Sequence, residues 1–451
     1  MNKKRRRSGF IGMLVVVLLA GLLVGGEAEA VKIRWATIAG FYTDWAKEVI
    51  KDFEKQNTDI DVEVVDIDFG VLYEKEGIEL VGKTGAYDLI TTESCWKPEW
   101  AHAGWLFPLD DFIVKTPREE LDMKDISPAL VKLACSYKGK VYALPYYTYT
   151  QGMFYRKDLF EDPLEKAAFF KKYGYPLAVP KAWEQHRDIA EFFTRKPGEK
   201  LKGKTLDKPF YGVGMMAGRF PQIQDEWMSI LWSWGGEIID EEGDIVVNSP
   251  IAQKALLHYK NMLKFAPPGA STSAYDEVVA QMKENMIAMT MGFYLDQAAN
   301  IIKVEETVPG AVIGAAPAPG WTAYIGAFGI GISMDSRHKE EAWKFLKFIS
   351  SKKAQIKFAL GGGTTCLMSV LKDPEIQAHR KTCWHYKTLA EILDYHEKHN
   401  ITHPFFDSPV AGKIYEELMI KINEGAMGTK PVKQALDELT ATIERLRAQV
   451  R

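Results

Sequence analysis

Strand-like and helix-like segments alternate along residues 31–91, and this alternation limits the possible folds more than any other feature of the chain. Residues 31–35 alternate apolar and polar side chains as a strand does, and residues 62–67 and 88–91 are two further strand-like segments. Between them, residues 42–53 and 71–81 repeat apolar side chains at helical spacing. Strands that alternate with helices in this way predict a parallel sheet covered by helices.

In such sheets, ligands bind beyond the carboxyl ends of the strands. Here those ends are residues 37–41, 68–69 and 92–96. The chain has 451 residues, more than one compact core usually holds, so we expect two domains. Its formal net charge is −3 with mixed signs, which argues against nucleic-acid binding.

The first thirty residues have the pattern of a secretory signal peptide. Five consecutive basic residues, Lys3 to Arg7, precede an apolar stretch over residues 10–24, and small residues follow at 25–30. The apolar stretch is short for a membrane span, which needs about 20 residues. We expect residues 1–30 to be removed on export. Because no Cys precedes Cys95, we expect no lipid anchor and a periplasmic protein.

The four cysteines are irregularly spaced. Export would permit disulfides, but a chain of this length does not need them. We expect mostly free, buried thiols, and a Cys366–Cys383 bridge stays open as an alternative. The other two cysteines are Cys95 and Cys135.

Three further motifs suggest phosphate binding, zinc binding or glycoside hydrolysis, but the residues around each motif argue against that function. Residues 77–84 have the spacing of a phosphate-binding P-loop, but they end a helix and lead into a strand, the reverse of the order that such a loop requires. His396, His399 and His403 lie close together without a ligand that completes a known zinc spacing. Asp110 and Asp111 are adjacent and point apart, unlike the paired carboxylates of a glycosidase. We therefore expect no catalytic residues, no metal and no cofactor.

Aromatic residues gather where strands end. A site that stacks on sugar rings and hydrogen-bonds their hydroxyls explains such clusters better than core packing alone. Trp105, Trp232 and Trp234 are the exceptions, which we assign to the core. The strand-end aromatic residues are Trp96, Trp100, Tyr146, Tyr147, Tyr149, Phe293, Tyr294, Trp321 and Tyr324.

The order of motifs along the chain resembles that of the extracellular solute-binding proteins of sugar ABC transporters, the maltose-binding-like group. Each motif alone is weak, but the ordered set covers nearly the whole chain after residue 30. The matching segments are residues 53–56, 87–90, 104–110, 139–145, 154–160, 180–183, 248–250, 288–292 and 342–346.

The resemblance implies an α/β fold of the periplasmic-binding-protein type. Each of its two domains would be a sheet flanked by helices, and crossing strands near Pro145, Ala327 and Thr365 would join the domains, with the ligand in the cleft between them. Domain I would hold residues 31–146 and 327–364, and domain II would hold 147–326 and most of 365–451.

The resemblance also implies which residues line the cleft. Several relatives have Trp at the position of Phe293, and the loop at residues 39–41 lacks the charged residues that some relatives have there. Carried over position by position, the lining residues are Ala39, Gly40, Phe41, Glu93, Ser94, Trp96, Tyr147, Tyr149, Gln222, Asp225, Phe293, Tyr294, Asp296, Gly326, Phe328, Gly362 and Thr364.

The function implied is capture of a mono- or oligosaccharide by hinge closure and its delivery to the permease subunits of an ABC importer, with the protein acting as a monomer. The same fold with a polyol or glycerol phosphate as its ligand is an alternative, although Arg219 is the only basic residue expected near the cleft. A secreted glycoside hydrolase is the alternative of another class.

Overall fold

The structure is a computed structural model that describes residues 30–450, without the side chains of Phe41 and Tyr42. The predicted signal peptide lies outside the described residues, except for Ala30. No helix of the described part is both long enough and apolar enough to cross a membrane.

The strands follow the predicted segments closely. The predicted strands at residues 31–35, 62–67 and 88–91 correspond to β1, β2 and β3. The strands are β1 (Val31–Ile38), β2 (Ile60–Ile67), β3 (Leu89–Glu93), β4 (Ser136–Tyr137), β5 (Lys140–Val141), β6 (Ala143–Thr148), β7 (Gln151–Arg156), β8 (Lys200–Leu201), β9 (Lys204–Thr205), β10 (Tyr211–Gly214), β11 (Ile287–Thr290), β12 (Phe293–Tyr294), β13 (Ile313–Ala316) and β14 (Ala327–Ile332).

Helices make up most of the remaining structure. They are α1 (Phe41–Glu54), α2 (Phe69–Gly82), α3 (Lys97–His102), α4 (Asp110–Lys115), α5 (Pro128–Leu130), η1 (Val131–Cys135), α6 (Lys157–Phe160), α7 (Pro163–Tyr173), α8 (Trp183–Phe193), α9 (Gln222–Ser233), α10 (Pro250–Met262), η2 (Leu263–Phe265), η3 (Ala270–Thr272), α11 (Tyr275–Lys283), η4 (Leu295–Gln297), α12 (Ala298–Ile301), α13 (Val304–Thr307), α14 (Lys339–Ile349), α15 (Lys352–Leu360), α16 (Met368–Leu371), α17 (Pro374–Gln377), α18 (Tyr386–Lys398), η5 (Pro404–Asp407), α19 (Ala411–Met427) and α20 (Val432–Ala448).

The first lobe is built around a five-stranded sheet in the order β2-β1-β3-β14-β6. The β1 strand runs parallel to β2 and β3, whereas β14 is antiparallel to both β3 and β6. The α1 and α14 helices pack on this sheet, and their rings meet where Phe53 lies 5.2 Å from Phe345, centroid to centroid. Trp35 of β1 is fully buried beneath them, 5.9 Å from Phe345.

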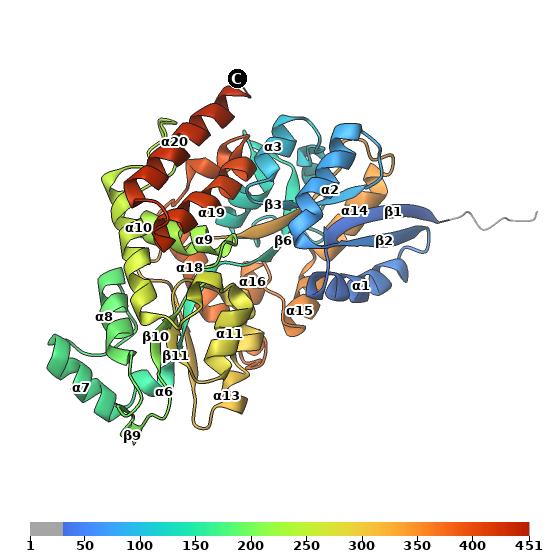
Figure 1. The fold of residues 1–451 in the computed structure, drawn as a ribbon. Coiled ribbons are helices and arrows are strands. Elements are labelled where there is room, and N and C mark those ends of the chain that lie inside the picture. Colours follow the sequence, from blue (N-terminus) through green and yellow to red (C-terminus); the bar gives the residue numbers. More distant parts are fainter. Residues whose placement is uncertain (1–29, 451) are drawn as a thin grey trace, which may run out of the picture.

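The second lobe is built around the sheet β10-β11-β7-β12, with β13 paired to the other side of β7. Helices cover it, as Figure 1 shows for α8 and α11, which contact β10 and β11. The α10 helix begins as its sequence predicts: the Ser249 side chain accepts a hydrogen bond from the Ala252 N–H at 3.3 Å, and Pro250 occupies the first turn.

Adjacent crossing segments connect the two sheets. Tyr149, between β6 and β7, and Gln151, the first residue of β7, donate backbone hydrogen bonds to the carbonyl groups of Gly326 and Tyr324 at 2.9 and 2.8 Å. The Thr148 N–H donates to the Thr364 carbonyl at 3.1 Å. Three stretches that are far apart in sequence therefore run side by side where one lobe joins the other.

The C-terminal helices lie mainly against the second lobe. The α19 helix contacts α9, α10 and α20, and Figure 1 shows α19 and α20 above α9 and beside α10. The α19 helix also reaches the first lobe, because Lys413 Nζ lies 3.8 Å from Glu99 Oε1 of α3. It therefore contacts both lobes.

The structure shows what surrounds the P-loop-like segment at residues 77–84, the histidine cluster and the cysteines. The α2 helix ends at Gly82 and is capped by Lys83 in the left-handed conformation (φ 51°), so residues 77–84 end a helix as the sequence predicts. His396 is buried, and its Nε2 donates to the Trp321 carbonyl at 3.1 Å, so it is not an exposed histidine at a helix end. Among the described residues, no three His, Cys, Asp or Glu side chains form a metal-binding group. All four cysteines are free and buried.

Candidate ligand-binding site

Strand register places three predicted site residues in one row across the first sheet. Phe328, near the start of β14, pairs with Glu93 of β3 on one side and with Tyr147 of β6 on the other. Glu93 is the last residue of β3, so the row lies at the carboxyl end of that strand, where a sheet of this type binds ligands.

Glu93 is the carboxylate that the first lobe contributes. It is 2 % exposed, and its Oε1 accepts hydrogen bonds from the phenols of Tyr149 and, at 3.5 Å, Tyr324. Its Oε2 accepts from the backbone N–H of Cys95 at 2.8 Å and from the Cys95 thiol. Burial raises the pKa of Glu93, and the hydrogen bonds only partly offset this effect.

Asp225 is a carboxylate of the second lobe with both oxygens occupied. It lies on α9 with no exposed surface, and it accepts the phenol hydrogens of Tyr294 at 2.5 Å and Tyr415 at 2.6 Å. Burial raises the pKa of Asp225 to about 8, although the two phenols act in the opposite direction. The α9, β12 and α19 segments thus meet at one side chain.

Asp296 joins the two lobes. It lies on η4, directly after β12, and its Oδ2 accepts a hydrogen bond from the phenol of Tyr147 on β6. Its Oδ1 is buried and has no hydrogen-bond partner in the described structure. Burial raises the pKa of Asp296 to about 6.

Stacked aromatic rings surround these carboxylates. Tyr147 lies 5.9 Å from Phe328 with nearly parallel rings, and Tyr149 lies 4.9 Å from Phe328. Tyr149 also meets Tyr294 of the second lobe edge-on at 5.8 Å. A Cβ on Gly326 would lie 2.0 Å from the Tyr149 ring, so only glycine leaves room for this packing.

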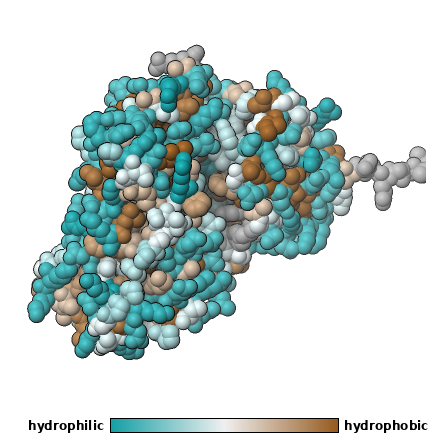
Figure 2. Space-filling model, in the orientation of Figure 1, coloured by the Kyte–Doolittle hydropathy of each residue, from teal (hydrophilic) through white to brown (hydrophobic). Residues whose placement is uncertain are grey.

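Trp96 is packed among other aromatic rings. It is 9 % exposed, and Phe69, Tyr73 and Trp100 all lie within 5.8 Å of its ring. Phe69 at the start of α2 is 41 % exposed and meets Phe328 edge-on at 6.1 Å. Figure 2 shows apolar surface on the lobe that carries α2, where the exposed apolar side chains are Phe69, Val71, Ile78 and Val81.

Contacts join seven of the seventeen predicted site residues into one network. Hydrogen bonds and ring contacts link Glu93, Tyr147, Tyr149, Asp225, Tyr294, Asp296 and Phe328. Ser94 lies at the crossing, where its hydroxyl donates to the Ala327 carbonyl at 3.1 Å. Gln222 lies one turn before Asp225 on α9, and its Oε1 is buried without a partner.

The remaining predicted residues lie less centrally. Ala39 and Gly40 are exposed between β1 and α1, and Phe41 begins α1, its side chain lying outside the described structure. Phe293 is fully buried against Phe154, with ring centroids 6.0 Å apart, so it acts as a core residue here. The remaining two belong to the stretch after α15: Gly362 has a φ of 103°, and the buried Thr364 has an unpartnered hydroxyl.

Three residues outside the predicted set belong to the network. Phe69 directly follows β2, at a strand end that the sequence identifies. Tyr324 stands in an aromatic cluster that the sequence also identifies. Tyr415 lies in the middle of a helical stretch, and no local signal sets it apart.

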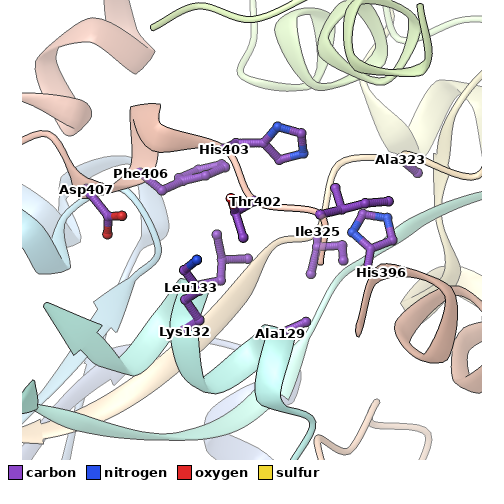
Figure 3. A pocket seen from close by; sticks show the side chains of 11 residues that line it. Ala129, Lys132, Leu133, Ala323, Ile325, His396, Thr402, His403, Phe406 and Asp407 are labelled. Atoms are coloured by element: carbon purple, nitrogen blue, oxygen red, sulfur yellow. The ribbon is translucent and has the colours of Figure 1, made fainter. Parts of the chain in front are cut away.

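A separate small cavity lies apart from this network (Figure 3). It has a volume of about 50 Å³, enough for a few water molecules. Its walls come from α5 and η1 of the first lobe, the stretch before β14, the end of α18, and η5 with the residues before it. No residue that lines this cavity is among the predicted site residues. The lining residues are Ala129, Lys132, Leu133, Ala323, Ile325, His396, Ile401, Thr402, His403, Phe406 and Asp407.

Comparisons with known proteins support the fold and the family. The model of the family described as bacterial extracellular solute-binding protein matches residues 39–356. An ABC transporter solute-binding protein from Agrobacterium radiobacter K84, in complex with ribitol, is 25% identical with a TM-score of 0.76, covering 93% of this chain and 99% of that one.

Two further similar proteins extend this comparison. Maltose-bound MalE3 of T. maritima has the same fold with a TM-score of 0.72 at 19% identity, and the match covers 92% of this chain and 100% of that one. A mannitol-binding protein of Pseudomonas aeruginosa is 24% identical over 350 residues, which is 75% of this chain and 73% of that protein.

Proposed function

Because this chain belongs to the family of bacterial extracellular solute-binding proteins, we propose that it captures a neutral polyhydroxylated solute, a sugar or an alditol, for an ABC importer. It would do so in the periplasm after removal of residues 1–30, act as a monomer without catalysis, and deliver the solute to the permease subunits in the membrane. Residues 31–146 and 327–364 would form one domain, which Tyr147 and Thr148 complete as the end of β6, and 149–326 with most of 365–451 would form the other.

One observation carries the choice of solute: the carboxylates of the site have only neutral hydrogen-bond partners, and Asp296 Oδ1 has none. Glu93, Asp225 and Asp296 accept hydrogen bonds from phenols and, for Glu93, from a thiol. Carboxylates accept hydrogen bonds strongly, and sugars and alditols present many O–H donors at short spacing. The surrounding rings of Tyr147, Tyr149 and Phe328 supply apolar walls for the carbon chain of such a ligand.

Two basic side chains, Lys97 and Arg219, are not placed to bind a phosphorylated ligand. Lys97 is buried, but its amine donates to the Leu133 and Ser136 carbonyl groups at 3.1 and 2.6 Å. Arg219, the candidate expected from the sequence, is exposed. A phosphate would therefore meet carboxylates without the paired arginine or lysine that it requires.

The similar proteins support the same solute class. One solved structure is a complex with ribitol and another is maltose-bound, and the Pseudomonas aeruginosa relative is a mannitol-binding protein. Both alditols and sugars therefore stay within the proposal.

The mechanism we propose is closure of the two lobes on the ligand. Tyr147 on the first sheet and Asp296 after β12 already face each other across the lobes, and the crossing segments at residues 148–151, 324–327 and 364 are where bending would occur. A ligand that contacts both lobes only in the closed form shifts the population toward that form.

Thermal unfolding with a panel of sugars and alditols tests the proposal. A ligand present at a hundredfold excess over its Kd stabilises the native state by about 2.7 kcal/mol, which should raise the melting temperature by a few degrees. A panel in which no sugar or alditol changes the melting temperature would contradict the proposed solute class.

A second test concerns the aromatic walls. We expect Phe69→Ala to weaken binding of the best ligand, because Phe69 is half-exposed beside Phe328. Val114→Ala, on the exposed α4 helix, is the matched control for loss of a surface apolar side chain. Equal affinities in the two variants would remove Phe69 from the site.

A further inference from the structure

We propose that the same cleft accepts an ammonium group in place of one ligand hydroxyl, with Asp296 as the carboxylate that binds it. Amino sugars and amino alditols would then belong to the ligand class, and sugar acids would not. This inference rests on the proposed function, since it concerns the polarity of the same site.

The carboxylates of the site differ in what they still can accept. Glu93 and Asp225 have partners on both oxygens, whereas Asp296 Oδ1 is buried without a partner. Two more predicted site residues, Gln222 and Thr364, have a buried side-chain oxygen without a partner. The oxygens of Asp296 and Gln222 can only accept hydrogen bonds, so a ligand group beside either of them must donate.

An ammonium group is such a donor. It presents three N–H bonds where a hydroxyl presents one, and its charge strengthens a hydrogen bond to a carboxylate. Of the three carboxylates, Asp296 is the best placed to bind a cation, because its Oδ1 has no hydrogen-bond partner, whereas both oxygens of Glu93 and of Asp225 are occupied. Its pKa of about 6 is consistent with an ionised side chain at neutral pH.

In the described part of the chain, no basic side chain forms an ion pair with Asp296. Against the effect of burial, the phenol of Tyr147 and the side chain of the next residue, Gln297, both lower its pKa by hydrogen bonding, and the phenols of Tyr275 and Tyr294 are the titratable groups that it influences. Aromatic faces also attract cations, so the Tyr147 ring would favour an ammonium over a carboxylate at this position. A sugar acid would instead bring a second negative charge beside Asp296.

Two matched ligand series test the inference on the unchanged protein by calorimetry. One series is sorbitol, glucamine and gluconate, and the other is glucose, glucosamine and glucuronate; within each, a neutral, an ammonium and a carboxylate form share a carbon skeleton. We expect the ammonium member to bind at least as tightly as the neutral one, and the carboxylate member at least about tenfold more weakly.

The Asp296→Asn variant then tests the assigned residue. Asparagine keeps the size and one acceptor but removes the charge, so we expect it to weaken binding of the ammonium member about tenfold more than binding of the neutral member. Asp111→Asn, on the surface of α4, is the control that removes a carboxylate elsewhere. Should Asp296→Asn fail to fold, the ranking on the unchanged protein still decides the charge preference.

The outcomes separate this inference from the proposed function. Binding of the neutral members with an ammonium member more than tenfold weaker overturns the inference alone. If the ammonium members bind and the neutral members do not, the inference is supported and the neutral solute class is overturned. No binding in either series overturns both. Equal losses for the two members in Asp296→Asn overturn the assignment of Asp296.

Discussion

Asp225 and Asp296 are both carboxylates of the second lobe, yet their environments differ. Asp225 is fully buried, with a phenol on each oxygen, and those phenols come from β12 and α19. Asp296 is only partly buried, has one phenol from the other lobe and keeps one oxygen free. A saturated carboxylate stabilises the fold, whereas an unsaturated one at the junction of two lobes is available to a ligand.

The comparison also explains why residue type alone misassigns roles. Both residues are predicted from the sequence to line the cleft, and only their partners separate them. We therefore expect substitutions at Asp225 to affect mainly stability, and substitutions at Asp296 to affect mainly binding.

The largest effect is expected for Asp225→Ala. This change leaves the phenols of Tyr294 and Tyr415 without an acceptor, and we expect the free energy of unfolding to fall by about 2–5 kcal/mol. Chemical denaturation measures it. Asp225→Asn, which keeps an acceptor and can itself donate, is the control and should lose much less. Similar losses in both variants would show that the phenol contacts do not stabilise the fold.

The second prediction concerns pH. The folded-state pKa of Asp225 is raised to about 8 by burial, so its contribution favours folding below its ordinary pKa near 4 and is lost as the pH rises toward 8. We expect a slope of up to about 1.4 kcal/mol per pH unit in this window from this residue. Unfolding at several pH values should show a shallower slope for Asp225→Asn. An unchanged slope would contradict the assignment.

The third prediction moves to Asp296. We expect Asp296→Ala to weaken binding of a neutral ligand about 10- to 100-fold, because a hydrogen bond to a charged group is lost, while the melting temperature of the free protein changes less than in Asp225→Ala. Titration calorimetry and thermal unfolding measure the two effects. If Asp296→Ala lowers the free energy of unfolding by more than it lowers the free energy of ligand binding, Asp296 acts mainly in stability, contrary to the comparison with Asp225.

The smallest effects are expected for single phenols. Tyr415→Phe and Tyr294→Phe each remove one hydrogen bond to Asp225, at about 1 kcal/mol of unfolding free energy. Because both phenols serve the same carboxylate, the double variant should deviate from additivity. Strict additivity in chemical denaturation would mean that the two hydrogen bonds act independently.

Much of the fold follows from local sequence pattern. Apolar alternation located β1 and β2 within a few residues, and Ser249 with Pro250 marked the start of α10, because these signals depend on neighbouring residues only. The site was predicted less completely. Phe69 and Tyr324 stood at positions that the sequence had marked, but Tyr415 comes from α19, far along the chain from the strands that it meets.

The sequence by itself determined the βαβ order, the family and the residue types that gather at strand ends, because periodicity and motif order are properties of neighbouring residues. Only the tertiary structure decided which carboxylates keep a free oxygen. The partners of Asp225 and Asp296 lie on β12, α19 and β6, and hydrogen-bond saturation depends on distances across the fold. Burial, which sets the pKa values of these carboxylates, depends on the same long-range packing.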